Sequence, residues 1–142
     1  MPEGGTVLAF DFGIKRTGVS SGELGIGVAH PLTVIQTDSA QERFNRISRL
    51  IKEWQPIMLV VGLPRHPDGT EHELSRAARN FAAKLENRFK LPVFLADERY
   101  TSQLAGEALH DAGVHGKKNR DHLDAVAAQL ILQGFFDARL TT

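Results

Sequence analysis

Asp11 is an acidic residue inside an otherwise apolar stretch. It interrupts the run VLAFDF (Val7–Phe12), and because side chains alternate along a strand it shares a face with Val7 and Ala9. Burying a lone carboxylate is costly, so this position requires a cationic partner, either a basic side chain or a metal ion. A salt bridge, or a turn-capping role before Gly13, is the structural alternative to metal binding.

Glu98 lies just past a strand expected over Pro92–Ala96, in the segment Asp97-Glu98-Arg99. The carboxyl ends of parallel strands are where α/β sheets bind ligands, so an acid at this position is well placed for chemistry. An ordinary polar loop, in which Glu98 pairs with Arg99 or Asp97 caps the next helix, explains the same residues equally well.

Asp124 lies on one stripe of the last expected helix, together with Ala127, Ala128 and Ile131. That stripe should face the sheet, so its carboxylate is predicted to point inward. Asp121 is the reserve candidate on the same side, although its ordinary role is to favour the helix N-terminus. We therefore favour Asp124 as the third acid.

Basic residues flank the three acids. Taken singly, each is more typical of a solvated surface charge, but together they predict a positive rim around a negative centre, which suits a phosphate backbone. These residues are Lys15, Arg16, Arg65, Arg99, Lys117 and Lys118. The loop over residues 62–70 also leads into a helix N-terminus whose amides could bind phosphate, or it simply turns the chain. Because the formal net charge is zero, any nucleic-acid surface must be local.

The composition excludes several classes of protein. With no cysteine, the chain has no disulfides, thiolate nucleophile or thiolate zinc site, and the histidines lack H-E-x-x-H spacing. No G-x-S-x-G or Walker loop is present. A length of 142 residues fits one domain over 1–142. No leader pattern or run of roughly 18 apolar residues occurs, so we expect a cytoplasmic protein without membrane contact.

Hydrophobic periodicity predicts an α/β fold. A three-strand meander is followed by two parallel strands, which gives a mixed five-stranded sheet with helices on both faces. S/T-x-x-E capping boxes are expected at Ser39/Glu42 and Thr70/Glu73, and Pro56 should end the first helix. The strands are expected over Val7–Phe12, Thr17–Ser21, Gly27–Ile35, Ile57–Gly62 and Pro92–Ala96, and the helices over 39–55, 70–89, Thr101–Ala112 and Asp121–Arg139.

Four segments resemble the YqgF family, whose members are described as Holliday junction resolvases and as pre-16S ribosomal RNA nucleases. The segments are FDFGIKRTGVS (Phe10–Ser20), VVGLPRHPDGT (Val60–Thr70), DERYTS (Asp97–Ser102) and LDAVAAQLIL (Leu123–Leu132), and together they span nearly the whole chain. The resemblance implies a ribonuclease H-like fold with Asp11, Glu98 and Asp124 as the catalytic acids. It also implies Mg²⁺ or Mn²⁺, which suits hard oxygen ligands.

The function expected from this resemblance is metal-dependent endonuclease activity in processing the 5′ end of precursor 16S rRNA during ribosome biogenesis. In the mechanism we infer, two ions bridged by Asp11 activate a water and stabilise the leaving oxygen, while Lys15, Arg16 and Arg99 position the strand. A Holliday junction resolvase acting on structured DNA and a non-catalytic assembly factor remain alternatives. A sugar-kinase-like ATPase would need a second lobe. Monomer and homodimer both remain open.

Overall fold

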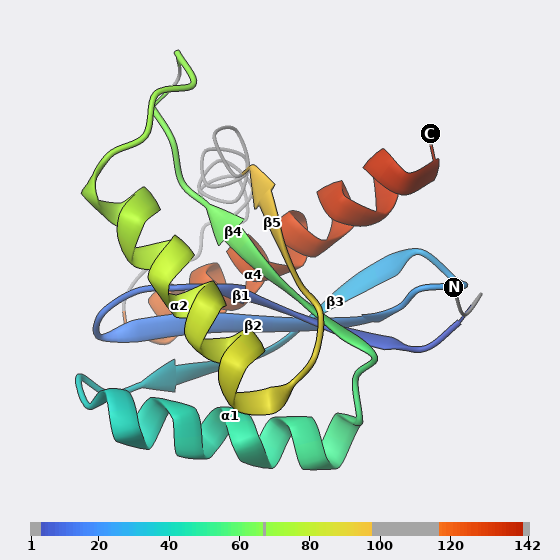
Figure 1. The fold of residues 1–142 in the computed structure, drawn as a ribbon, viewed down its shortest axis with the longest axis horizontal. Coiled ribbons are helices and arrows are strands. Elements are labelled where there is room, and N and C mark those ends of the chain that lie inside the picture. Colours follow the sequence, from blue (N-terminus) through green and yellow to red (C-terminus); the bar gives the residue numbers. More distant parts are fainter. Residues whose placement is uncertain (1–3, 67, 98–116, 141–142) are drawn as a thin grey trace.

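The computed structural model describes residues 4–66, 68–97 and 117–140 (Figure 1). The predicted order of elements is confirmed within these ranges, while the helix expected over Thr101–Ala112 lies outside them. The elements are β1 (Thr6–Asp11), β2 (Arg16–Glu23), β3 (Val28–Gln36), α1 (Ala40–Trp54), β4 (Met58–Leu63), α2 (Glu73–Phe89), β5 (Val93–Asp97) and α4 (Lys117–Leu140). None of the helices described here is long and apolar enough to cross a membrane.

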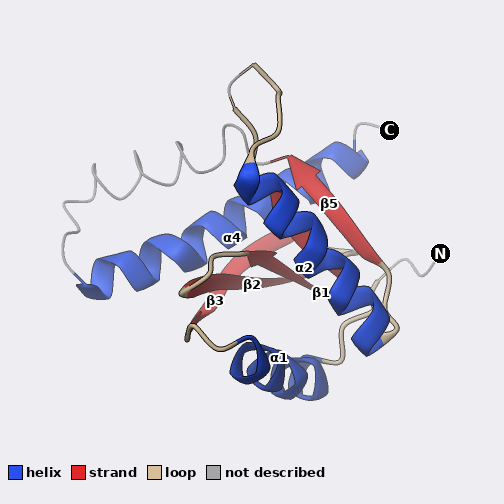
Figure 2. Cartoon of the chain, turned by 60° about the vertical axis from the view of Figure 1, so that its left-hand side comes forward, coloured by secondary structure: helices blue, strands red, loops and turns tan. Residues whose placement is uncertain are grey.

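The five strands form one mixed sheet in the order β3-β2-β1-β4-β5, as predicted. The first three strands pair antiparallel, and β4 and β5 run parallel to β1. The sheet therefore has β1 at its centre, and the carboxyl ends of β1, β4 and β5 meet at one edge. Figure 2 shows α1 and α2 on one face of the sheet and α4 on the other.

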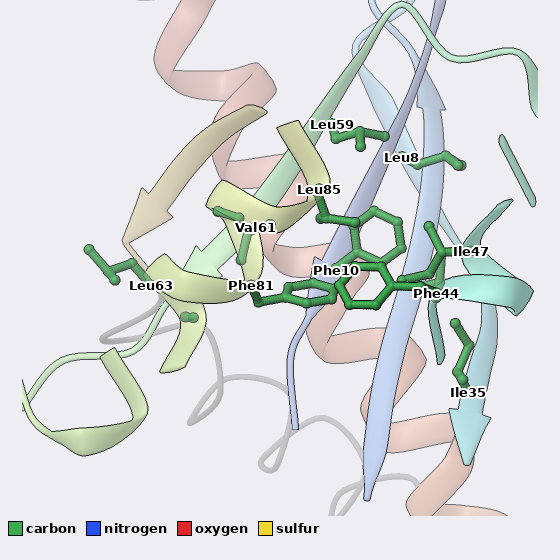
Figure 3. Close-up of a cluster of buried hydrophobic side chains, with 13 residues drawn as sticks. Leu8, Phe10, Ile35, Phe44, Ile47, Leu59, Val61, Leu63, Phe81 and Leu85 are labelled. Atoms are coloured by element: carbon green, nitrogen blue, oxygen red, sulfur yellow. The ribbon is translucent and has the colours of Figure 1, made fainter. Parts of the chain in front are cut away.

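The core between the sheet and helices α1 and α2 is built around aromatic rings (Figure 3). Phe81 of α2 meets Phe10 edge to face at 5.9 Å and stacks on Phe12 at 4.6 Å. Phe44 of α1 approaches the same ring at 5.9 Å. Burying each such side chain contributes about 1.5–3 kcal/mol, so this cluster fixes both helices on the sheet.

The predicted end of α1 is confirmed, but its predicted capping box is only half formed, because the Ser39 N–H donates to the Thr37 hydroxyl oxygen at 3.1 Å and not to Glu42. The box predicted at the start of α2 is absent. Ser39 caps α1 by accepting from the Glu42 N–H at 3.2 Å, and the helix ends at Trp54, before Pro56. The Thr70/Glu73 capping box is wrong, because Thr70 instead donates to Asp68 through its N–H and its hydroxyl. His72 caps α2 in its place, in a box with Ser75.

Small residues of β2 let α4 pack unusually close to the opposite face. A Cβ on Gly18 would lie 1.9 Å from the backbone oxygen of Asp124, and one on Gly22 would lie 2.7 Å from the Phe136 ring. Between them, the Ser20 hydroxyl donates to the Ala128 carbonyl at 2.7 Å. Gly18, Ser20 and Gly22, at alternate positions of β2, therefore form the surface on which α4 packs.

Two glutamines of α4 bind the exposed backbone of edge strand β3. Gln129 donates to the Ala29 carbonyl at 3.1 Å, and the Gln133 side chain accepts from the Ala29 N–H at 3.0 Å. Gln133 also donates to the Gly27 carbonyl at 2.9 Å. These contacts satisfy polar groups that an edge strand otherwise leaves unpaired, and they join α4 to the edge of the sheet.

We predict that Gly18→Ala destabilises the protein by about 1–3 kcal/mol, because the added methyl would overlap the α4 backbone. Gly134→Ala is the control. Gly134 lies in α4 itself, and an added Cβ there meets nothing within 4 Å. The substitution should stabilise α4 by about 0.5–1 kcal/mol. Denaturant unfolding of both variants measures this difference. Equal stability of Gly18→Ala and the wild type would contradict the close approach.

Candidate active site

Asp11 ends the central strand at the edge where the parallel strands finish. It is half-buried and pairs with Gly18 across the antiparallel ladder. Val7 and Ala9, on the same face of β1, belong to the core beneath α4. The predicted strand is present, and its two-residue period places Asp11 on the same face as Val7 and Ala9, the face that α4 covers.

Asp124 reaches the same place from α4. Its backbone lies directly over Gly18, and its Oδ2 accepts from the Nε of Arg16 at 2.6 Å. Asp11 and Asp124 therefore border the same glycine on the same face of the sheet. The close packing of α4 brings together two acids that are far apart in the sequence.

The Arg16–Asp124 ion pair is partly desolvated, with the two side chains 25% and 27% exposed. Arg16 lies two residues before Gly18 in β2, so strand alternation places it on the α4 face beside the carboxylate. Sequence reasoning assigned Arg16 only to substrate. The structure also gives it a protein partner, because its guanidinium compensates the half-buried charge of Asp124.

The turn between β1 and β2 is tight. A Cβ on Gly13 would lie 2.3 Å from the Arg16 carbonyl oxygen, and the buried Thr17 hydroxyl donates to the Gly13 carbonyl at 3.2 Å. This turn joins Asp11 directly to Arg16. Its shape therefore decides where both charged groups lie.

Arg43 of α1 is a buried residue that sequence reasoning missed. Its side chain reaches the β1–β2 turn from the α1 face, and the residue is only 5% exposed. Burial lowers the pKa of its guanidinium, and the charge of Asp38 opposes that shift. One signal was available in the sequence, because Arg43 lies one turn before buried Ile47 on the apolar stripe.

The loop between β4 and α2 also leaves the sheet at this edge. The His66 N–H donates to the Thr70 carbonyl at 2.9 Å, and Asp68 closes the turn by accepting from Thr70. The same hydrogen bonds lower the pKa of Asp68. Lower in the loop, the Arg79 guanidinium binds Glu71 at 2.7 and 3.1 Å, which lowers the pKa of Glu71. The described residues of this loop are therefore bound to each other and, through Arg79, to α2.

Besides Arg16, two of the predicted basic residues are described at this edge. Lys15 is exposed in the β1–β2 turn, and Arg65 is half-buried at the start of the β4–α2 loop. The Arg65 Nε is buried and has no hydrogen-bond partner among the described residues. Arg99 lies outside those residues, as do the side chains of Lys117 and Lys118 at the start of α4.

Glu98 and the Asp121 side chain also lie outside the described part of the chain. The neighbouring Asp97 ends β5, and Ala96 packs against the α4-side core. Within residues 4–66, 68–97 and 117–140, no three acidic or histidine side chains gather as a metal site. The three-acid arrangement stays a prediction, while the described pair, Asp11 and Asp124, offers the hard oxygen atoms that Mg²⁺ and Mn²⁺ prefer.

The chain is similar to known protein sequences over nearly its whole length. The family described as RuvX, Holliday junction resolvase, matches residues 5–138. A relative from Thiobacillus denitrificans is 65% identical over 137 residues, which cover 96% of this chain and 94% of the relative. A relative from Nitrosomonas europaea is 56% identical over 133 residues, covering 94% and 90% respectively. Both carry the name "Putative pre-16S rRNA nuclease".

Comparison with solved structures identifies the fold. Thermus thermophilus RuvC in complex with a Holliday junction substrate has a TM-score of 0.55 and 23% identity, and the match covers 96% of each chain. The yeast mitochondrial Holliday junction resolvase Ydc2 has a TM-score of 0.56 and 14% identity, with 95% of this chain and 80% of that chain covered. At these identities the likeness concerns the fold alone, and the predicted ribonuclease H-like architecture is confirmed.

We predict that Arg16 and Asp124 stabilise each other by about 1 kcal/mol in the absence of metal, because their ion pair is partly buried. A double-mutant cycle with Arg16→Ala and Asp124→Ala, unfolded in excess chelator, measures this coupling. The pair Arg46–Glu42 on α1, with both side chains more than 40% exposed, is the control and should give about 0.3–0.5 kcal/mol. Additive effects of Arg16→Ala and Asp124→Ala would contradict the ion pair.

Proposed function

The chain belongs to the RuvX family, and from this premise we propose that it is a metal-dependent endonuclease that processes the 5′ end of precursor 16S rRNA. The structural observation that carries the proposal is the meeting of Asp11 and Asp124 at Gly18. The names of the two relatives supply the substrate class. An rRNA precursor as substrate keeps the cytoplasm as the expected compartment.

The proposed site would hold Mg²⁺ or Mn²⁺ through the carboxylates of Asp11, Asp124 and Glu98. We propose Glu98 as the third acid because it directly follows Asp97 in the sequence, and Asp97 ends β5 at the edge of the sheet where the parallel strands finish. Bound metal supplies Lewis acidity that activates a water and stabilises charge on the phosphate and the leaving oxygen. The protein's part is to hold the carboxylates in fixed directions.

Basic residues of the neighbouring loops would hold the nucleic acid. Lys15 and Arg65 lie in the loops that follow β1 and β4, at the edge where Asp11 ends β1. They would contact phosphates on either side of the scissile bond. Arg16 would serve twice, because a guanidinium has five N–H donors and can bind Asp124 and a phosphate together. We propose Arg99, Lys117 and Lys118 as further members of this positive rim.

DNA junction cleavage is the second candidate, and the description of the family is the observation that favours it. A direct comparison separates the two. Precursor 16S rRNA, linear duplex DNA and a four-way DNA junction should be incubated with the protein at matched salt, with Mn²⁺, Mg²⁺ or chelator. We expect cleavage near the 5′ end of the RNA. Cleavage of the junction alone would support the alternative, and metal-independent binding without cleavage would identify an assembly factor.

We predict that Asp11→Asn, Glu98→Gln and Asp124→Asn each remove most of the cleavage activity while leaving the fold intact, because each removes one negative oxygen ligand. Cleavage rates and circular dichroism measure the two effects. Asp137→Asn, on the exposed side of the same α4 helix, is the control and should retain full activity. The proposal is wrong if purified Asp11→Asn cleaves normally or if excess chelator has no effect.

Thermal melting provides a test that needs no substrate. Mn²⁺ should raise the melting temperature of the wild type by binding the folded state, and it should do so less for Asp11→Asn and Asp124→Asn. The Asp137→Asn control should respond like the wild type. An equal Mn²⁺ response in all four proteins would place the metal site elsewhere.

We predict that Lys15→Ala and Arg65→Ala weaken RNA binding for all sequences and reduce its salt dependence, because each removes a phosphate contact. Binding should be titrated at several salt concentrations, and each substitution should lower the slope of log K against log salt by about one. Lys52→Ala, in the last turn of α1, is the control. An unchanged slope in both Lys15→Ala and Arg65→Ala would mean that the RNA binds another surface.

A further inference from the structure

Arg43 binds the β1–β2 turn from beneath, on the face of the sheet opposite α4. Its Nη2 donates to the backbone carbonyls of Ile14 and Thr37, the latter at 3.2 Å. The guanidinium carbon lies 5.2 Å from the centre of the Phe12 ring, in cation–π geometry. One side chain of α1 thus contacts the turn at two residues and the end of β3 at a third.

Arg43 does not form an ion pair with a carboxylate among the described residues, so charge pairing does not explain why it is buried. Its hydrogen-bond acceptors in the described residues are carbonyls, not carboxylates, and its buried Nε has no partner among them. Asp38 acts on it only at longer range. Burying a guanidinium in this way lowers the free energy of unfolding. An apolar side chain of similar size would stabilise the folded state more.

The contacts made by Arg43 lead to the acids of the candidate site. Phe12 directly follows Asp11, and the Thr37 N–H donates to the Lys15 carbonyl at 3.0 Å, next to Arg16. Arg16 in turn holds Asp124. Arg43 therefore contacts both ends of the turn. It meets the Asp11 end through Phe12, and it meets the Arg16 end through Thr37, which is hydrogen-bonded to Lys15.

We propose that Arg43 is a positioning residue that fixes the β1–β2 turn, so that Asp11 and Arg16 keep their directions at the metal and substrate site. This inference rests on the proposed nuclease function. Arg43 lies on the far side of the sheet from α4 and acts through the turn, without contact with the substrate. Its planar guanidinium suits this role because it can donate in two directions while it stacks on Phe12.

Substitutions at Arg43 separate positioning from packing. Arg43→Met keeps most of the buried volume and removes every donor, and Arg43→Lys keeps the charge but loses the fork geometry. Arg46→Met is the matched control, one turn further along the same helix, with its side chain 41% exposed. All variants should be assayed well below their melting temperatures, against the wild type, with precursor rRNA as substrate.

We expect Arg43→Met to lower kcat by about tenfold or more with KM changed less than about twofold, because misdirected groups chiefly affect the transition state. Its Mn²⁺ affinity, measured by titration calorimetry, should fall, and the Thr37 amide should exchange with solvent faster. Arg43→Lys should show smaller changes of the same kind, and Arg46→Met none. If Arg43→Met does not fold, Arg43→Lys carries the same test.

Wild-type kcat and Mn²⁺ affinity in Arg43→Met would overturn the positioning role, even if that variant melts at a lower temperature, since packing alone predicts that result. Failure of the proposed function would look different. In that case the wild type itself would not cleave RNA, while slower Thr37 exchange in the wild type than in Arg43→Met would still support the positioning of the turn.

Discussion

The contact between the backbones of Gly18 and Asp124 is the constraint from which the candidate site follows. A helix can approach a strand this closely only where the strand presents small side chains or none, and β2 presents Gly18, Ser20 and Gly22 in alternate positions beneath α4. The same approach buries the apolar residues of α4 against β1 and β4. Because Gly18 is also the ladder partner of Asp11, one packing contact both completes the core and brings a second acid to the end of the central strand.

One guanidinium group on each face of the sheet contacts the residues around the candidate site. On the α4 face, Arg16 binds Asp124 and reduces the cost of two acids lying near one another. On the other face, Arg43 donates to the Ile14 carbonyl, in the turn that joins Asp11 to Arg16, and to the Thr37 carbonyl, just after β3. Each guanidinium is partly or fully removed from water, so it stays in place through hydrogen bonds with defined directions. Arg16 thus contacts Asp124 on the α4 face, and Arg43 contacts the β1–β2 turn on the opposite face.

The topology explains why chemistry and substrate binding would share one edge of this small domain. The three parallel strands end side by side, and Lys15 and Arg65 lie in the loops that follow β1 and β4 at the edge where Asp11 ends β1. At that edge the chain leaves the hydrogen-bonded ladder, so side chains there can face a ligand without breaking the sheet. The opposite ends of these strands take part in the core and its connections. A nuclease site and its phosphate contacts can therefore be built without a second domain.

The sequence by itself determined the features that depend on local periodicity. Alternation along VLAFDF predicted the face of Asp11, the helical stripe predicted an inward Asp124, and the order of apolar segments predicted the mixed sheet. Only the tertiary structure decided which partners the charged groups meet. Arg16 and Asp124 are 108 residues apart, and the burial of Arg43 depends on a turn 29 residues away. The cap of α2 moved from Thr70 to His72 because Asp68 competes for Thr70 in the folded loop. The change of cap is local, because Asp68 and Thr70 are two residues apart. The contacts of Arg16 and Arg43 instead arise from the placement of whole elements against each other, which no local pattern encodes.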